Sequence, residues 1–307
     1  MGKIAFVFSG QGAQYPGMGA TLAQASPAAA RVFDLCDSIR PGTSAQCFSG
    51  TKEELTVTSN TQPDMFAVEV AAAAALVEAG IRPDALAGFS VGEIGALAFS
   101  GALSVEDSFR LVCLRGELMQ QASDAADTGM VAVVKLPPQQ VEELAAGFDQ
   151  VYPVNYNGPG QTVCAGLSAS MEGFKAAVKN AGGRAIPLRV AGAFHSPFMS
   201  SASQGLAEAL KDYSFTQPQY TLYSNVTGKP YEGVETYADM LARQVISPVR
   251  WQQIVEHLIA DGVDTFIEVG PGNTLTGLIG KIDSSVKCCN VDSAETLEKT
   301  ISEVQHG

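Results

Sequence analysis

The 307-residue sequence is short of basic side chains. It has 19 Lys and Arg against 32 Asp and Glu, a net charge of −13 at pH 7, and no basic run. A protein that follows a nucleic-acid backbone needs clustered Lys and Arg to neutralise phosphates. We therefore expect no nucleic acid among its partners.

The sequence also lacks the cysteine patterns of metal and disulfide sites. Its six cysteines form no Cys-x-x-Cys pair, and none has a histidine nearby at metal-ligand spacing. They are Cys36, Cys47, Cys113, Cys164, Cys288 and Cys289. This pattern predicts reduced thiols in the cytoplasm, with no metal and no redox cofactor.

Long apolar runs are missing as well. A membrane-spanning helix needs a run of about 18 or more apolar residues, but the Ala-rich segment 65–80 is interrupted by Glu69 and Glu78. The opening "MGKIAFVFSGQG" has too short an apolar run for a signal peptide and predicts a first strand. The hydrophobic content of 46% predicts a globular protein with a buried core, and the missing apolar run predicts that it is soluble.

Short apolar runs alternate with longer segments of helical periodicity. Strands are predicted at 4–8, 85–88, 221–224 and 265–269, and helices at 63–79, 104–121 and 251–260. This alternation predicts an α/β fold, in which helices cover both faces of a parallel sheet.

The order changes between about 128 and 190 to the β-α-β-β-α-β order of ferredoxin-like folds. Strands are predicted at 130–134, 152–156, 162–165 and 185–189, and helices at 139–146 and 171–181. We predict a large catalytic domain from 1–126 and 193–307, with a small ferredoxin-like subdomain, 127–192, inserted into it.

The segment "GFSVGEIGAL", 88–97, places Ser90 between two glycines. It follows a predicted strand and precedes a helical pattern, which is the context of a nucleophile elbow. A nucleophilic serine also needs a base within hydrogen-bond reach. The alternative is a serine that caps the helix beginning near Val91.

Only three histidines could supply that base. His306 is one residue from the C-terminus, and His257 points off the apolar stripe of its predicted helix. His195, in "GAFHSPFM", follows the inserted subdomain in a loop of small and aromatic residues. Elimination favours His195 as the base, against the alternative of a structural loop histidine.

Arg115 interrupts the apolar stripe of the predicted helix 104–121. An inward guanidinium requires an anion. The partner could be an internal carboxylate such as Glu93 or Glu117, or the carboxylate of a substrate, which the planar fork of Arg can hold with two hydrogen bonds. Helical spacing leaves both open.

Two glycine-rich loops follow predicted strands. The first, Ser9–Gly19, fails as a dinucleotide fingerprint because Tyr15 occupies the place of the third glycine. Its backbone N–H groups could hold an oxyanion, or the loop could be an ordinary turn. The second, Glu268–Leu275, contains no side chain that demands catalysis.

Seven segments, taken in order, resemble the malonyl-CoA:acyl carrier protein transacylases and the related acyltransferase domains of fatty acid and polyketide synthases. They are "FSGQGAQYPGMG", "GFSVGEIGAL", "LRGELMQ", "NGPGQTVCAG", "GAFHSPFM", "RQVISPVRW" and "EVGPGNTL". The resemblance spans nearly the whole chain. It implies a large α/β-hydrolase-like domain with a parallel sheet and a nucleophile elbow, plus an inserted ferredoxin-like domain.

The resemblance also implies the reacting groups. Ser90 corresponds to the acylated nucleophile, and His195 to its general base and acid. The backbone N–H groups of Gln11 and Val91 correspond to the oxyanion hole.

Further residues correspond to groups that select the substrate or orient the base. The resemblance implies that Arg115 binds the malonyl carboxylate and that the backbone carbonyl of Gln244 orients His195. Phe194 resembles the bulky residue of malonyl-selective members, which leaves little room for an α-methyl substituent.

Two positions depart from the pattern of the bacterial members. Phe89 replaces the histidine common before the serine, as in the mitochondrial-type enzymes, and Ser9 replaces the proline common before "GQG". Neither change removes a catalytic group, but the effects of Phe89 and Phe198 on acyl selectivity stay open.

The implied activity is ping-pong transfer of malonyl from coenzyme A to Ser90 and then to the phosphopantetheine thiol of an acyl carrier protein. The expected partners are malonyl-CoA and this carrier protein, and the expected form is a monomer. The alternatives are a serine hydrolase or thioesterase of related fold, a trans-acting polyketide acyltransferase, and a non-catalytic scaffold. An inward Arg115 argues against a simple esterase.

Overall fold

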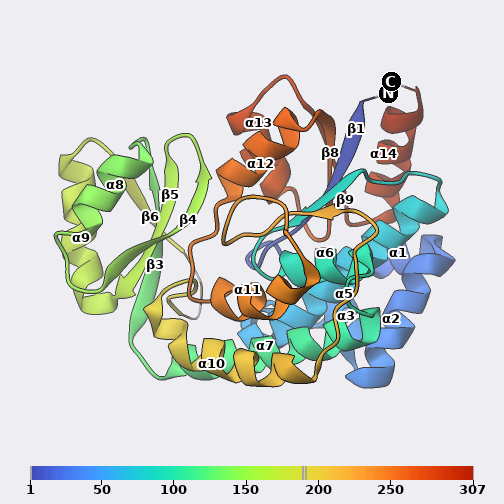
Figure 1. The fold of residues 1–307 in the computed structure, drawn as a ribbon, viewed down its shortest axis with the longest axis horizontal. Coiled ribbons are helices and arrows are strands. Elements are labelled where there is room, and N and C mark those ends of the chain that lie inside the picture. The colour runs from blue at the N-terminus through green and yellow to red at the C-terminus, as the bar shows by residue number, and fades with distance from the viewer. Residues whose placement is uncertain (1, 189, 191, 307) are drawn as a thin grey trace.

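The computed structural model describes residues 2–188, 190 and 192–306. The larger lobe is built on a parallel sheet of five strands in the order β7-β2-β1-β8-β9 (Figure 1). The strands are β1 (Lys3–Phe8), β2 (Ala85–Gly88), β7 (Thr221–Leu222), β8 (Val263–Val269) and β9 (Lys287–Val291). Residues 5–8 are buried on both faces of β1, which is typical of a central parallel strand.

Helices cover both faces of this sheet. Those before the small lobe are α1 (Ala20–Ala25), α2 (Pro27–Ile39), α3 (Thr43–Ser49), α4 (Lys52–Thr56), α5 (Thr58–Glu78), α6 (Gly92–Ser100) and α7 (Val105–Asp124). Those after it are α10 (Ser200–Ala209), α11 (Tyr237–Gln244), α12 (Trp251–Ala260), α13 (Thr274–Ile282) and α14 (Ala294–His306), with short 3-10 turns η1 (Pro197–Met199), η2 (Leu210–Asp212) and η3 (Val234–Thr236).

The smaller lobe follows the predicted β-α-β-β-α-β order. Its elements are β3 (Thr128–Val134), α8 (Pro138–Ala145), β4 (Val151–Gly158), β5 (Gln161–Leu167), α9 (Ser168–Asn180) and β6 (Arg184–Pro187). The strands pair antiparallel in the order β4-β5-β3-β6. The predicted α/β fold with an inserted ferredoxin-like part is therefore confirmed, and the proposed unit 127–192 encloses all six elements.

Several predicted bounds were wrong. Helix α5 begins at Thr58 rather than Pro63, and the proline lies inside it. Because α5 is buried on nearly all sides, its packing outweighs the one hydrogen bond that Pro63 cannot donate. Strand β7 ends at Leu222 because the chain turns back at Ser224, whose N–H donates to Lys229. The predicted end of the last small strand, Arg189, lies outside the described residues.

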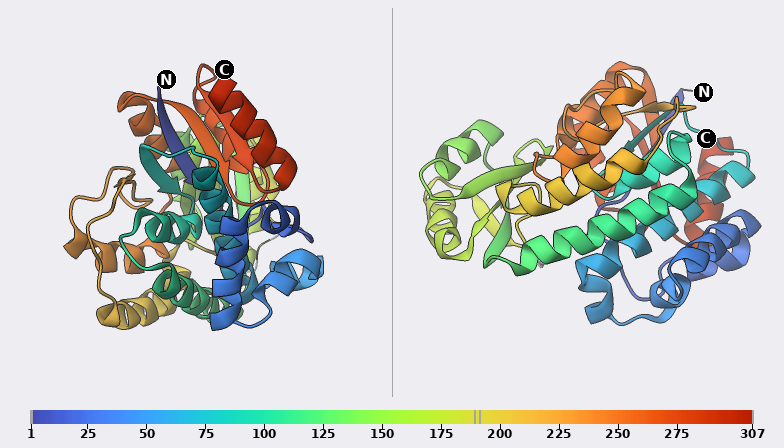
Figure 2. Two further views of the ribbon diagram at one scale, coloured as in Figure 1. Left: turned by 90° about the vertical axis from the view of Figure 1, so that its right-hand side faces the viewer. Right: turned by 60° about the horizontal axis from the view of Figure 1, so that its bottom comes forward.

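Several contacts, including the packing of α12 and α13 against β4, connect the large lobe to the small one. Helices α7 and α10, which lead into it and out of it, lie side by side (Figure 2). In addition, Val249 accepts a backbone hydrogen bond from Tyr156 and donates one to Val154, each over 2.9 Å. These bonds join β4 to the segment before α12.

Across the described residues, no helix combines the length and the apolar content needed to cross a bilayer.

Candidate active site

Ser90 lies on a tight turn between β2 and α6, with a positive φ of 56°. A Cβ added to Gly88 would lie 2.0 Å from the carbonyl carbon of Gly92, and one added to Gly92 would lie 2.4 Å from the carbonyl oxygen of Phe8. Both positions therefore require glycine. The turn is held by Asn225, whose Oδ1 accepts from the Ser90 N–H over 2.7 Å.

The hydroxyl of Ser90 does not cap the helix. Helix α6 has Val91 at its N-cap and no side-chain capping bond. The Oγ atom of Ser90 lies instead 2.7 Å from Nε2 of His195 and 3.2 Å from Nη2 of Arg115. The alternative of a capping serine is wrong, because the side chain points into the site.

His195 lies in the loop before η1 and is 4% exposed. Its Nδ1 lies 2.9 Å from the backbone oxygen of Gln244, so Nδ1 carries the proton and Nε2 offers a lone pair to Ser90. Burial, with the positive charge of Arg115, lowers the pKa of His195 to about 4. The imidazole is therefore neutral near pH 7, as a base must be.

The other histidine in question lies elsewhere. His257 is on α12, and its Nδ1 lies 2.7 Å from the backbone oxygen of Gly228. This hydrogen bond gives His257 a structural role.

Arg115 is 1% exposed on α7, and two amide groups hold its guanidinium. Nη1 donates to Oε1 of Gln62 over 2.6 Å, and Nη2 donates to Oε1 of Gln244 over 2.7 Å. Burial lowers its pKa to about 10, so the group stays cationic near neutral pH. Among the described residues neither Glu93 nor Glu117 forms an ion pair with it. Of the two kinds of partner left open by the sequence, an internal carboxylate does not contact the guanidinium; neutral amides hold it, and the buried carboxyls of Glu93 and Glu69 act on it only from farther away.

Gln11 lies in the glycine-rich loop after β1, beside the serine turn. A Cβ on Gly10 would lie 2.8 Å from the ring of Phe89, which shows how closely this loop approaches. Tyr15 anchors the loop through a 2.9 Å hydrogen bond to Asp292. No described residue accepts a hydrogen bond from the backbone N–H of Gln11 or Val91.

A cavity of about 220 Å³ opens between the lobes next to this turn. Its wall includes Gln11 and Phe89 from the large lobe, and Asn155 and Asn157 from β4. The Oδ1 atoms of both asparagines are buried without a hydrogen-bond partner in the described part of the chain. The cavity wall therefore combines apolar side chains with polar ones, and two of its amide oxygens have no partner among the described residues.

The chain matches the acyl transferase domain model over residues 5–304. It is 38% identical to a malonyl CoA-acyl carrier protein transacylase of Bacillus subtilis, with 98% of this chain and 97% of the relative covered. The corresponding Escherichia coli enzyme is 37% identical, with 92% and 93% covered. The chain belongs to this acyl transferase family.

Solved structures of the family have the same fold. The malonyl CoA-acyl carrier protein transacylase of Clostridium perfringens superimposes with a TM-score of 0.95 at 36% identity, covering 99% of this chain and 97% of that one. A malonyl-transacylase in complex with its type II polyketide acyl-carrier protein superimposes with a TM-score of 0.94 at 35% identity, covering 98% and 99%.

Of the three phenylalanines noted in the sequence of this acyl transferase, Phe89 lines the cavity. Phe194 is 6% exposed and belongs to the main core. Phe89 lies on the cavity wall, edge-on to Trp251 with ring centroids 5.6 Å apart. Phe198 packs edge-on against Tyr152 of β4, with ring centroids 6.3 Å apart.

Three contacts of the site were not found from the sequence: the side chains of Gln62, Asn225 and Gln244. Each is a buried amide. The only local signal is a polar residue in a predominantly apolar context, such as Gln62 at the start of a buried helix. Such a signal does not indicate which group the amide contacts.

Proposed function

We propose that this chain transfers a malonyl group from malonyl-CoA to the phosphopantetheine thiol of an acyl carrier protein, through an ester on Ser90. One observation carries the proposal. A buried guanidinium, that of Arg115, lies 3.2 Å from the Oγ atom that His195 activates. A malonyl group carries its carboxylate two bonds from its reacting carbonyl carbon, so one group can meet both residues.

In the first half-reaction, Ser90 Oγ attacks the thioester carbonyl carbon while His195 Nε2 takes the hydroxyl proton. The carbonyl oxygen becomes an oxyanion, which the N–H groups of Gln11 and Val91 would stabilise. When the C–S bond breaks, the imidazolium gives its proton to the sulfur. Coenzyme A then departs as the free thiol, and a malonyl ester remains on Ser90.

The second half-reaction reverses these roles. The carrier-protein thiol loses its proton to His195 and attacks the ester carbonyl. Collapse of the tetrahedral intermediate breaks the bond to Oγ, and the imidazolium returns the proton to Ser90. The backbone oxygen of Gln244 holds the ring in the same tautomer throughout.

Arg115 selects the acyl group in this scheme. Gln62 and Gln244 hold its planar fork from two sides, so little conformational entropy is lost when a carboxylate binds. A neutral acyl chain would give the guanidinium no carboxylate to contact, which disfavours it.

The cavity between the lobes suits the arm that delivers the thioester. Phosphopantetheine is a chain with two amide groups, whose N–H donors match the free Oδ1 acceptors of Asn155 and Asn157. Phe89 would pack against its apolar parts. The proposed partners are malonyl-CoA and an acyl carrier protein, and the proposed form is a cytoplasmic monomer without metal or redox cofactor.

The test is to mix the protein with malonyl-CoA and measure its intact mass, and then to add a carrier protein bearing phosphopantetheine. We expect one malonyl group at Ser90, which moves to the carrier thiol. Release of free malonate at the same rate without the carrier would identify a hydrolase instead. A missing label would indicate a non-catalytic protein.

A further inference from the structure

Glu93 is a buried carboxyl group that the reaction above does not use. It lies on α6, three residues after Ser90, and is 0% exposed. Its two oxygens have separate sets of donors. Oε1 accepts from the backbone N–H of Asn225 over 3.2 Å and from the hydroxyl of Tyr231 over 2.6 Å, while Oε2 accepts from the side-chain amide of Gln244.

The side-chain amide of Gln244 in turn contacts both hydrogen-bond acceptors and a hydrogen-bond donor. Its Nε2 donates to Glu93 and to the backbone oxygen of Ser90, the latter over 2.9 Å. Its Oε1 accepts from Nη2 of Arg115 over 2.7 Å. A flipped amide would direct its NH₂ group at the guanidinium, donor against donor, and its oxygen at the Glu93 carboxyl and the Ser90 carbonyl.

We propose that Glu93 is a positioning residue for acyl selectivity, which fixes the Gln244 amide so that its oxygen holds the Arg115 fork. The inference rests on the proposed malonyl transfer and extends it to a residue that touches neither substrate nor reacting atom. Glu93 forms no ion pair with Arg115 in the described structure, so the hydrogen-bonded path between them runs through the Gln244 amide.

The Glu93→Gln variant tests this orientation with almost no change in shape. The two donors at the Oε1 position require an oxygen there, so the new NH₂ group must occupy the Oε2 position and face the NH₂ group of Gln244. Gln244 must then turn its oxygen toward residue 93, and Arg115 loses its acceptor.

We expect kcat/KM for malonyl-CoA to fall about 10- to 100-fold in Glu93→Gln, the range of one hydrogen bond to a charged group. Transfer of acetyl from acetyl-CoA, which does not use Arg115, should change by less than about threefold. The readout is therefore the malonyl to acetyl ratio, which a general loss of folded structure would not change.

Tyr231→Phe is the matched control. It also removes a hydrogen bond from the Glu93 carboxyl, but at Oε1, where Asn225 still donates. The ratio should stay at the wild-type value. Gln244→Leu removes the side-chain amide itself but keeps the backbone oxygen that orients His195. This variant should therefore lose malonyl selectivity, as Glu93→Gln does.

Equal falls in malonyl and acetyl transfer, or an unchanged ratio in Glu93→Gln or Gln244→Leu, would overturn the inference. Failure of the wild-type protein to transfer malonyl would overturn the proposed function instead. Circular dichroism and thermal melting of each variant accompany the kinetics.

Discussion

His195 is oriented by Gln244 through a neutral backbone oxygen, 2.9 Å from Nδ1, where many serine enzymes use a carboxylate. Without an adjacent anion, the backbone hydrogen bonds to Gln244 and Ser247 offset only part of the effects of burial and of the Arg115 cation on the imidazolium. This explains why the pKa of His195 is lowered to about 4, and it leads to the first prediction.

The pH dependence of the nucleophile should follow this low pKa. Labelling of Ser90 by a neutral serine-reactive sulfonyl fluoride should be almost independent of pH from about 8 to about 5, and should decline below that as His195 becomes protonated. Arg115→Leu removes the nearby positive charge, so the acid limb should move to higher pH. If labelling of the wild-type protein declined near the ordinary histidine pKa instead, the prediction would be contradicted.

Ser90→Ala should abolish the malonyl-enzyme, because among the described side chains only Ser90 forms a hydrogen bond with Nε2 of His195. His195→Ala should slow acylation by roughly two to four orders of magnitude, through loss of the base. Peptide mapping after incubation with malonyl-CoA checks both. Acyl groups found on another residue would eliminate Ser90.

Arg115→Ala separates a malonyl transferase from a general acyl transferase. Each hydrogen bond to a charged group contributes about 1.5–3 kcal/mol, so loss of a two-pronged contact should reduce malonyl transfer by roughly two to four powers of ten. Acetyl transfer should persist or rise. Equal reductions, in a variant that melts like the wild type, would make Arg115 a structural residue.

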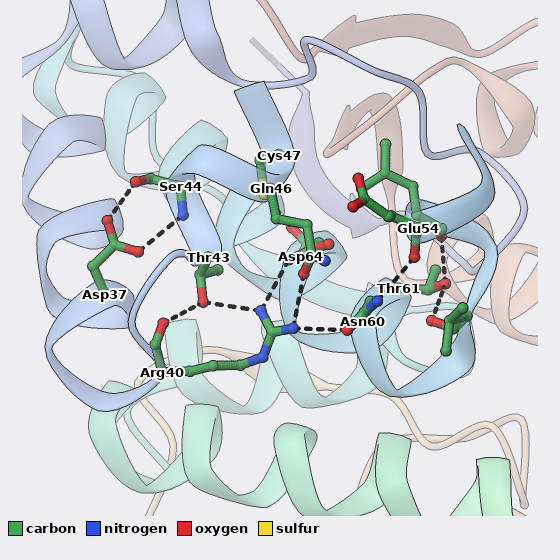
Figure 3. A network of polar contacts seen from close by, with 12 residues as sticks. Asp37, Arg40, Thr43, Ser44, Gln46, Cys47, Glu54, Asn60, Thr61 and Asp64 are labelled. Atoms are coloured by element: carbon green, nitrogen blue, oxygen red, sulfur yellow. Dashed lines mark hydrogen bonds and ion pairs between the residues drawn. The ribbon is translucent and has the colours of Figure 1, made fainter. Parts of the chain in front are cut away.

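Arg40 should stabilise the fold through Asp64. Its guanidinium donates to Asn60, Gln46 and Thr43, and lies 3.5 Å from the buried Asp64 carboxyl (Figure 3). Arg40→Ala should lower the free energy of unfolding by about 2–3 kcal/mol at pH 8, because it leaves a buried charge without its partner.

The size of that effect should depend on pH. Burial raises the pKa of Asp64 to about 7, above its value in the unfolded chain, so stability is lost as pH rises toward 7. At about pH 5 the carboxyl is protonated and needs no cation, so the Arg40→Ala penalty should shrink. Urea titrations of Arg40→Ala at both pH values measure the change in this penalty. The exposed pair Arg31–Glu78 is the control, because Arg31→Ala should change the free energy of unfolding by less than about 1 kcal/mol.

Two helical glycines should respond oppositely to substitution by alanine. A Cβ at Gly92 would lie 2.4 Å from backbone oxygens of residues 8 and 9, so Gly92→Ala should displace the Ser90 turn and lose both stability and labelling. A Cβ at Gly277 of α13 meets nothing within 4 Å, so Gly277→Ala should raise stability by about 0.5–1 kcal/mol. Thermal melting checks the pair.

The sequence by itself determined the features that depend on neighbouring residues. Short, continuously apolar runs placed β1 and β2, and a 3.6-residue period placed α12, because a strand buried on both faces needs apolar side chains on each face, whereas a helix packed on one side needs them only there. The Gly-x-Ser-x-Gly segment placed Ser90 on its turn for a local reason too: the glycines that permit the close approach lie within two residues of it.

Only the tertiary structure decided which groups meet. Gln244 is 129 residues from Arg115 and 151 from Glu93, so no local period relates them. Their contact depends on how α6, α7 and α11 pack, and the start of α5 at Thr58 likewise depends on its burial against other helices. Long-range packing determines which donor reaches which acceptor. It therefore decided that amides surround Arg115, because the spacing of residues along the chain does not specify these contacts.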